Sequence, residues 1–381
     1  MFSHLSKKTL VKSAIFKNTP VYVQFYVTAR CNLTCLQCNI RYSNADVREC
    51  TIEEIKKIAE NFASIGVAIV LLTGGEPFTR NDLPEVIREF ESRGIHVRMQ
   101  TNGLATEEMI HKCIEYGGRD ISISLDSLNP DTQDVINGGF KSTWERAIKS
   151  ISIFTKYLPK ENSFASLGCV IQRKNLYDIE DLIKFGSKIG WYTSLVPIHI
   201  SEKFHPLGFR TYDKTLRFKP EEYQVVDSLI ERVRLMRNEG YLLYDSDQYL
   251  DDIKRFIKED PITWRMKNNN VCDSPNLYFA VLPNGDFAPC CDHRLPYSVH
   301  AYSPNFPTIY NEKVFRSEVH KITSACAGCM YGSYPEITIS LRFLAASLQR
   351  LKNFYTTPTN KKWPISYEEM INIAKNIKSG A

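Results

Sequence analysis

Residues 21–200 alternate short β-rich runs with longer helical stretches, and this alternation constrains the fold more than any other feature of the chain. Repeated strand–helix units predict a parallel sheet covered by helices. With right-handed crossovers, six such units form an incomplete (β/α)6 barrel of the α/β class, similar to a TIM barrel that has not closed. The expected strands are residues 21–28, 68–72, 96–101, 120–125, 164–171 and 195–200, and the expected helices are residues 52–65, 83–93, 106–116, 144–157 and 178–189.

Polar or glycine-rich motifs follow the first three expected strands. They are residues 31–38 (CNLTCLQC), residues 73–77 (TGGEP) and residues 102–103 (NG). In parallel α/β folds, ligands bind at the carboxyl ends of the strands. We therefore expect the three motifs to share one rim of the barrel.

Cysteines are grouped in this chain, which has 11 of them in 381 residues. The number is odd and the density is far below that of a disulfide scaffold, so grouped thiols indicate metal ligands or catalytic groups. We expect Cys50, Cys113 and Cys169 to be small buried residues, and Cys291 is ambiguous because it adjoins a grouped cysteine. The grouped cysteines, which predict two metal sites, are Cys31, Cys35, Cys38, Cys272, Cys290, Cys326 and Cys329.

The first two motifs have complementary chemistry. Three thiolates within one short loop suit an iron–sulfur cluster with one iron left open, or a zinc site with a fourth ligand from elsewhere. Gly74 and Gly75 let the backbone approach a ligand closely, and the Glu76 carboxylate can accept a hydrogen bond from an ammonium group. Taken alone, the second motif would also suit a tight turn.

Together, a C-x3-C-x2-C triplet after the first strand and GGEP after the second resemble the radical S-adenosylmethionine (SAM) superfamily, over about residues 21–200. The resemblance implies that Cys31, Cys35 and Cys38 hold a [4Fe–4S] cluster whose open iron chelates the amine and carboxylate of SAM. Reductive cleavage of SAM would yield a 5′-deoxyadenosyl radical that abstracts a substrate hydrogen. It also implies a reductant such as flavodoxin or ferredoxin.

Further SAM contacts are implied at several strand ends. In the family, the GGEP segment contacts the methionine amine, here through Gly74, Gly75 and Glu76. Most family members carry an aromatic residue before the third cysteine, packed on the adenine, whereas this chain has Gln37. That difference concerns the adenine contact and not the cluster. The remaining implied SAM contacts are Thr101, Asn102, Ser124 and Asp126, although the last two would also suit turn and capping roles.

The four later cysteines resemble those of the twitch domain, a shortened SPASM domain that follows many radical SAM barrels. Cys272 and Cys290 flank a predicted hairpin turn at residues 282–286, and Cys326 and Cys329 follow with two residues between them. The resemblance implies one auxiliary [4Fe–4S] cluster. A Cys₄ zinc site is the alternative, and Cys291 could replace Cys290 as a ligand.

An auxiliary cluster can accept the electron released when a substrate radical is oxidised. In the resembled family, such clusters accompany oxidation of alcohols or thiols and crosslinking of peptides, whereas epimerisation or group transfer does not need them as acceptors. A general base could also be required. Asp245, Asp247 and Asp273 are candidates, although a surface or capping role suits each of them better.

The expected organisation has five parts: an N-terminal extension (1–20), the barrel (21–218), a helical connection (219–269), the twitch/SPASM-like domain (270–336) and a basic helical tail (337–381). The tail has helical apolar spacing at Leu341, Leu344, Leu348, Leu351 and Phe354. We expect a closing helix packed on the barrel. A basic amphipathic helix that contacts a membrane surface or an acidic partner is less favoured.

Composition and charge exclude several classes of function. No apolar run approaches the roughly 20 residues that span a bilayer, and the N-terminus lacks the apolar region of a secretory signal. We therefore expect a cytoplasmic protein. A net charge of +5, without basic stripes interleaved with aromatics, does not indicate nucleic-acid binding.

These observations predict a radical SAM oxidoreductase that oxidises (dehydrogenates) a small molecule, with the auxiliary cluster as electron acceptor. A ribosomal peptide maturase that crosslinks or epimerises is also compatible with the motifs. Few residues precede the first expected strand, whereas peptide maturases often carry an N-terminal recognition domain, so a small molecule is favoured. A radical C–C bond-forming or lipid-modifying enzyme is less favoured, and a non-catalytic zinc-binding protein is the least favoured reading of the cysteines.

Overall fold

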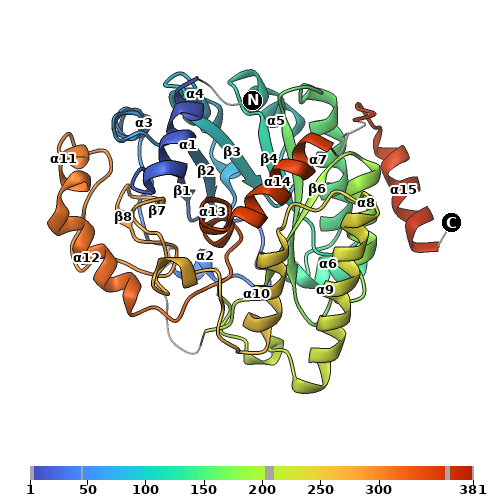
Figure 1. The fold of residues 1–381 in the computed structure, drawn as a ribbon. Coiled ribbons are helices and arrows are strands. Elements are labelled where there is room, and N and C mark those ends of the chain that lie inside the picture. Colours follow the sequence, from blue (N-terminus) through green and yellow to red (C-terminus); the bar gives the residue numbers. More distant parts are fainter. Residues whose placement is uncertain (1–3, 44–45, 202–209, 357–360, 380–381) are drawn as a thin grey trace.

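The computed structural model describes residues 4–43, 46–201, 210–356 and 361–379, and it contains one eight-stranded open sheet (Figure 1). The strand order is β6-β5-β4-β3-β2-β1-β7-β8, and all neighbours are parallel except β7 and β8. The predicted incomplete (β/α)6 barrel is therefore confirmed. The strands are β1 (Tyr22–Thr28), β2 (Ile69–Gly74), β3 (His96–Thr101), β4 (Asp120–Ser124), β5 (Phe164–Ile171), β6 (Tyr192–Pro197), β7 (Tyr278–Val281) and β8 (Phe287–Ala288).

Helices of the N-terminal half cover the outer face of this sheet, and local sequence signals mark their ends. The helix at 52–65 begins at a capping box of Thr51 with Glu54 and ends at the left-handed Gly66. The short helix at 130–136 is not among the expected elements, although Asn129 and Pro130 form a good start signal. The helices are α2 (Ile40–Ser43), α3 (Ile52–Ile65), α4 (Leu83–Glu91), α5 (Glu107–Glu115), α6 (Pro130–Ile136), α7 (Thr143–Tyr157) and α8 (Ile179–Lys188).

Strand β6 begins three residues before the expected start at 195. Gly190 adopts a left-handed conformation (φ 76°) that turns the chain directly after α8, so the sheet resumes at Tyr192. At the other end, Ile200 forms only an isolated bridge with Thr211, so residues 198–200 lie beyond the strand.

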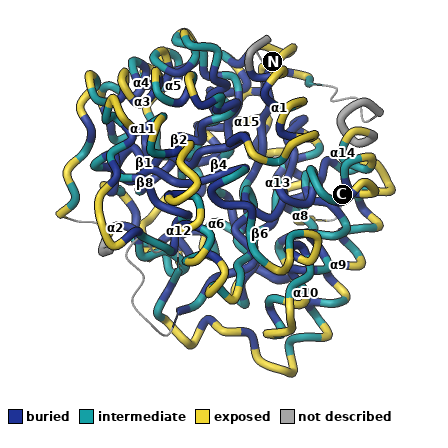
Figure 2. The backbone as a smooth tube through the Cα atoms, turned by 60° about the vertical axis from the view of Figure 1, so that its left-hand side comes forward, coloured by how far each residue is buried: buried dark blue, intermediate teal, exposed yellow. Residues whose placement is uncertain are grey.

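Side chains of β1 alternate between two core clusters, one on each face of the sheet, and every residue of the strand is buried (Figure 2). Val23 and Phe25 belong to the core beneath the outer helices, whereas Tyr22 and Tyr26 belong to a second cluster on the inner face. Helix α13 (Ser333–Arg342) covers that inner face, and its Tyr334 hydroxyl donates to Gln24 Oε1 at 2.7 Å. Strand β1 is therefore buried on both sides, as is usual for parallel sheets.

The predicted hairpin at 282–286 is confirmed, and it lies inside the barrel sheet. Residues Tyr278 and Phe279 pair with Tyr22 and Val23 of β1, so the cysteine-bearing segment extends the sheet of the barrel. The five-part division of the chain stays a prediction. The remaining helices are α1 (His4–Phe16), α9 (Tyr223–Asn238), α10 (Asp247–Ile257), α11 (Phe306–Asn311), α12 (Lys313–Ser324), α14 (Leu344–Thr356) and α15 (Tyr367–Ser379), with single 3₁₀ turns at Pro77–Thr79, Lys214–Leu216, Pro220–Glu222 and Met266–Asn268.

The tail divides into two helices with different surroundings. Met370 and Ala374 of α15 are buried, and α15 packs against α7 and α8, as expected for a closing helix. The expectation of a packed apolar face is wrong for Leu344, Leu348 and Leu351, which are exposed. Helix α14 instead faces the protein with Ala346, which is buried, and with Gln349 and Arg350, which bind Asp247 and Glu336. The Phe354 side chain lies outside the described residues. Among the described residues, no helix has both the length and the apolarity to cross a membrane.

Trp363 anchors the approach to α15 and gives a stability prediction. Its side chain is 2% exposed, its Nε1 donates to Ile189 O at 2.8 Å, and its ring packs against Trp191. Trp363→Ala leaves a cavity and should lower the free energy of unfolding by about 3–5 kcal/mol, measured by urea denaturation. Tyr177→Ala, which removes an exposed aromatic ring, should leave it unchanged; equal stability of both variants would contradict the packed tail.

Candidate active site

The cysteine loop that follows β1 is supported from below by α6. Cys31, Cys35 and Cys38 are half-buried free thiols. Cys35 Sγ lies 3.5 Å from Asn137 Oδ1, and Leu36 N donates to Ile136 O at 2.9 Å. Burial raises the pKa of the Cys38 thiol to about 12, and the nearby Cys31 adds to the effect.

Two glycines allow the TGGEP motif to contact the cysteine loop directly. Gly75 N donates to Thr28 O at 2.9 Å, and Glu76 N donates to Arg30 O at 2.8 Å. A Cβ on Gly74 would lie 2.1 Å from Thr28 O, and a Cβ on Gly75 would lie 2.1 Å from Arg30 O. Because no side chain fits at either position, glycine is required for this approach.

Glu76 joins the second motif to the third. Its buried carboxylate accepts hydrogen bonds from Thr101 Oγ1 at 2.8 Å and from Asn102 N at 2.6 Å. Burial raises the pKa of the Glu76 carboxyl to about 7, while these donors act in the opposite direction. Asn102 Nδ2 also donates to Asn32 Oδ1 at 2.7 Å and lies 4.0 Å from Cys31 Sγ. The prediction that the three motifs share one rim is therefore confirmed.

Asp126, just after β4, extends this rim. Its carboxylate accepts from Val170 N at 2.7 Å and from Gln37 Nε2 at 3.2 Å. Burial raises the pKa of the Asp126 carboxyl to about 7. Gln37 thus makes a polar link to the rim where an aromatic residue would pack, and its Oε1 has no hydrogen-bond partner among the described residues. Ser124 is half-buried at the end of β4.

The four later cysteines gather around the β7–β8 segment. Burial, with the neighbouring Cys290 and Cys326 thiols, raises the pKa of the Cys272 thiol to about 12. Burial and the charges of Cys326 and Cys290 likewise raise the pKa of the Cys329 thiol. Cys291 is fully buried, and its hydrogen bond to Cys290 lowers the pKa of the Cys290 thiol. Cys290 is therefore half-buried like the other thiols of the quartet, whereas Cys291 is buried and forms a hydrogen bond with Cys290.

A polar cluster links this quartet to the barrel. Arg210, beyond β6, forms an ion pair with Asp292 (Nε to Oδ2 2.9 Å), and the Tyr331 hydroxyl lies 3.1 Å from the other oxygen. Tyr331 stacks on His199, with ring centroids 4.0 Å apart, and Met330 N donates to His199 Nε2. Burial lowers the pKa of His199 to about 3, so the ring is neutral. No local sequence signal marks this cluster, because its members come from three distant segments.

The three candidate bases all have partners within the fold. Asp245 accepts from Leu195 N at 2.7 Å, and burial raises the pKa of its carboxyl to about 8. Asp247 is the first residue of α10 and forms ion pairs with Arg237 and Arg234, and Asp273 is buried against Arg342 and Thr338. These contacts tie each carboxylate into the fold.

The donor groups fit the cofactors that the sequence implies. Three thiols of one loop lie beside a glycine cradle and a buried carboxylate, and the four later thiols lie near enough to act electrostatically on one another. Within the described ranges, no three His, Cys, Asp or Glu side chains converge closely enough for a single ion. A polynuclear cluster binds its thiolates at different irons, so it does not need that convergence.

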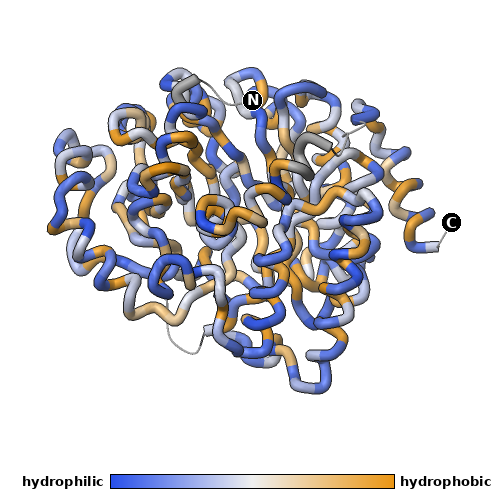
Figure 3. Tube along the Cα trace, viewed as in Figure 1, coloured by the Kyte–Doolittle hydropathy of each residue, from blue (hydrophilic) through white to orange (hydrophobic). Residues whose placement is uncertain are grey.

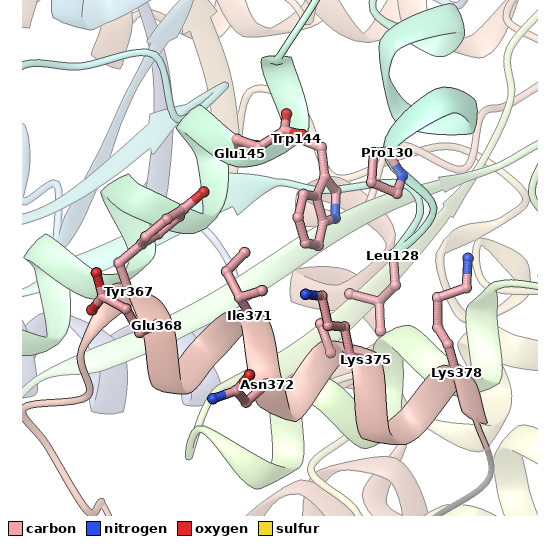
Figure 4. Close-up of a pocket in the computed structure, with 11 residues that line it drawn as sticks. Leu128, Pro130, Trp144, Glu145, Tyr367, Glu368, Ile371, Asn372, Lys375 and Lys378 are labelled. Atoms are coloured by element: carbon pink, nitrogen blue, oxygen red, sulfur yellow. The ribbon is translucent and has the colours of Figure 1, made fainter.

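A pocket of about 620 Å³ lies elsewhere, between α15 and the α6–α7 region (Figure 4). Trp144 and Tyr367 contribute aromatic rings to it, and Lys375 and Lys378 lie along its edge. None of the predicted site residues lines it. It is therefore separate from the rim that carries the motifs.

Gly75→Ala tests whether the close contact of the two loops matters. The added Cβ must separate residue 75 from Arg30 O, so hydrogen exchange at the amides of residues 75 and 76 should accelerate and stability should fall by about 1–3 kcal/mol. Gly240→Ala is the control, because its Cβ meets nothing within 4 Å and only its positive φ of 98° adds strain. Unchanged protection of both amides in Gly75→Ala would contradict the contact.

Comparison with known proteins agrees with this geometry. Residues 25–186 match the family model described as the Radical SAM superfamily. The AdoMet-dependent heme synthase of Methanosarcina barkeri is 31% identical, over 45% of this chain and 49% of that protein. The Fe-coproporphyrin III synthase of the same organism is 28% identical, over 70% of this chain and 60% of that protein. A probable GTP 3′,8-cyclase of Pyrococcus abyssi is 29% identical over 57% and 70%. The chain thus spans about half the length of the first of these relatives.

Solved structures resemble the chain over most of its length. Streptococcus suis SuiB bound to precursor peptide SuiA has a TM-score of 0.60 at 16% identity and covers 82% of this chain and 70% of its own. Native anSMEcpe with bound AdoMet and Cp18Cys peptide has a TM-score of 0.58 at 16% identity and covers 94% and 99%. At these identities the likeness concerns the fold. Residues 25–186, which carry the cysteine triplet and the glycine cradle at one rim, are thus the part of this chain that matches the radical SAM superfamily.

Proposed function

We propose that this protein is a radical SAM oxidoreductase that dehydrogenates a small molecule. In this proposal Cys31, Cys35 and Cys38 hold the [4Fe–4S] cluster of the barrel, and Cys272, Cys290, Cys326 and Cys329 hold an auxiliary one. The cofactors supply a 5′-deoxyadenosyl radical for hydrogen abstraction and an acceptor for the electron that the substrate radical loses, while its proton passes to a base. The observation that carries the proposal is the quartet of thiols on a segment continuous with the barrel sheet.

The rim residues have distinct tasks in this proposal. Glu76, held by Thr101 and Asn102, accepts hydrogen bonds from the amine N–H groups of SAM, and the glycine pair keeps the backbone open beside it. Asp126 and Gln37 form a polar wall toward the nucleoside. The ion pair of Arg210 with Asp292 holds the quartet against the barrel, which shortens the path of an electron from the substrate.

A small-molecule substrate is supported by the names of the curated relatives. Heme synthase, Fe-coproporphyrin III synthase and GTP 3′,8-cyclase are all named for small molecules. A peptide is the second candidate, because two structures with the same fold are described with bound peptides. A flavodoxin- or ferredoxin-type reductant completes the proposed partners.

Iron content tests the two clusters. Anaerobically reconstituted protein should hold about eight irons per chain, because each [4Fe–4S] cluster contributes four. Replacing Cys31, Cys35 and Cys38 by Ala should halve this number and abolish 5′-deoxyadenosine formation with dithionite. Replacing the quartet by Ala should also halve it but leave dithionite-driven SAM cleavage. Cys113→Ala, which removes a buried thiol of α5, is the control. A colourless protein that contains zinc would overturn the proposal.

The substrate class is tested with a low-molecular-mass extract of the producing organism. The extract should stimulate 5′-deoxyadenosine formation, and the stimulation should survive digestion of the extract with a protease. Loss of stimulation after digestion would favour the peptide instead. Stimulation that persists unchanged in the quartet variant over many turnovers would contradict an auxiliary electron acceptor.

SAM affinity should depend on pH through Glu76. Because burial raises the pKa of this carboxyl to about 7, it is protonated below that pH and is a weaker acceptor for the amine N–H groups of SAM. Affinity measured by equilibrium dialysis should therefore rise up to about tenfold per pH unit as pH increases toward 7, and then level off. Glu76→Gln should bind weakly with no such slope. The same slope in both proteins would show that another group is responsible.

A further inference from the structure

Two helices of this protein are exposed on their apolar sides. On α14, Leu344, Leu348 and Leu351 follow a spacing of four and three residues, and they are 72, 57 and 52% exposed. On α1, Val11, Ile15 and Phe16 are each more than 60% exposed. Single exposed apolar residues are common on protein surfaces, but two such helices are not.

Polar contacts fix the orientation of α14. Arg350, on its buried side, forms an ion pair with Glu336 at 3.0 Å and lies over the Tyr244 ring. Gln349 Nε2 donates to Asp247 Oδ2 at 2.6 Å. Rotating the helix to bury its leucines would leave the buried Glu336 carboxylate without Arg350, which is costly. The three leucines therefore stay exposed on the protein surface.

Helix α1 also turns polar side chains toward the protein and apolar side chains toward the outside. Its buried positions are Ser6, Thr9 and Ser13, which lie on one side of the helix. Ser6 Oγ contacts two carbonyl oxygens, Ala68 O at 3.0 Å and Gly94 O at 2.7 Å. Small hydroxyl side chains, together with Leu10, thus hold α1 against the barrel, whereas Val11, Ile15 and Phe16 face outward.

Both helices lie at the amino end of the barrel. Ala68 immediately precedes β2 and Gly94 lies two residues before β3, so α1 covers the start of these strands. Tyr244, beneath Arg350, pairs with Thr193 near the start of β6. In Figure 2, α1 and α14 both lie toward the upper right of the view, whereas α2, which follows the cysteine loop, lies at the left.

Basic residues border the exposed apolar residues of both helices. Lys7, Lys8 and Lys12 of α1 are exposed, and neither α1 nor α14 contains an acidic residue. Lys267 lies over the Phe343 ring, 4.6 Å from its centroid, where α14 begins. Figure 3 shows that hydrophobic and hydrophilic residues alternate along the two helices. Apolar side chains bordered by lysines are typical of helices that lie in the interface of an anionic membrane.

We propose that the amino-end face, defined by Val11, Ile15, Phe16, Leu344, Leu348 and Leu351, docks the protein onto an anionic lipid surface. The apolar side chains enter the headgroup region, and the lysines pair with lipid phosphates and carboxylates. The rim with the cysteine triplet lies at the opposite ends of the strands, so it faces the aqueous side. The substrate then arrives from water and not from the bilayer.

Vesicle sedimentation of the full chain tests this proposal without any cofactor assay. The protein should sediment with phosphatidylcholine vesicles that contain about a third phosphatidylserine, and far less with phosphatidylcholine alone. Binding should fall as salt increases. The triple variant Leu344→Ser, Leu348→Ser, Leu351→Ser should weaken binding at least about tenfold, and so should Val11→Ser, Ile15→Ser, Phe16→Ser. Lys7→Gln, Lys8→Gln and Lys12→Gln should each weaken it about fivefold.

The matched control replaces three exposed apolar residues of other surfaces, Tyr177, Leu235 and Val314, by Ser, and it should bind as the wild type does. Circular dichroism and iron content should be unchanged in all variants, which separates docking from the proposed chemistry. Absence of binding to the anionic vesicles would overturn the proposal, as would equal weakening in the control. A wild-type dimer that the Leu344, Leu348 and Leu351 substitutions dissociate, without lipid binding, would assign the face to contacts between copies.

Discussion

Two backbone hydrogen bonds, from Gly75 N to Thr28 O and from Glu76 N to Arg30 O, hold the site together. They join the ends of β1 and β2 so closely that neither Gly74 nor Gly75 has room for a Cβ. This contact places the Glu76 carboxylate beneath Asn102, and Asn102 reaches back to the cysteine loop. Three strand ends thereby become one rigid rim, which a reactive cofactor requires, because the protein contributes position rather than chemistry.

The barrel could be predicted because its signals are local. Helix α3 matches its expected limits, since a capping box precedes it and a left-handed glycine ends it. The rim could be predicted because parallel strands bring their carboxyl ends together whatever the lengths of the connections. The expected start of β6 is too late, since the apolar run from 195 extends beyond the sheet and the strand begins directly after the Gly190 turn.

Features that depend on distant segments could not be predicted. The ion pair of Arg210 with Asp292 and the link of Gln37 to Asp126 join residues with no common local pattern. Helical spacing of leucines shows that one side of α14 is apolar, but not which side faces the protein. That choice depends on Glu336, which forms a buried ion pair with Arg350 and so keeps the polar side of the helix inward.

Strand β7 has a consequence for how the chain is made. It covers the free edge of β1, yet it follows β1 by most of the length of the protein. A ribosome that adds 5–20 residues per second completes β7 on the order of tens of seconds after β1. During that interval β1, which leads into the cysteine loop, is an unpaired edge strand with which another strand can pair incorrectly. Newborn chains should thus be most prone to aggregation after the barrel helices have formed and before the hairpin emerges.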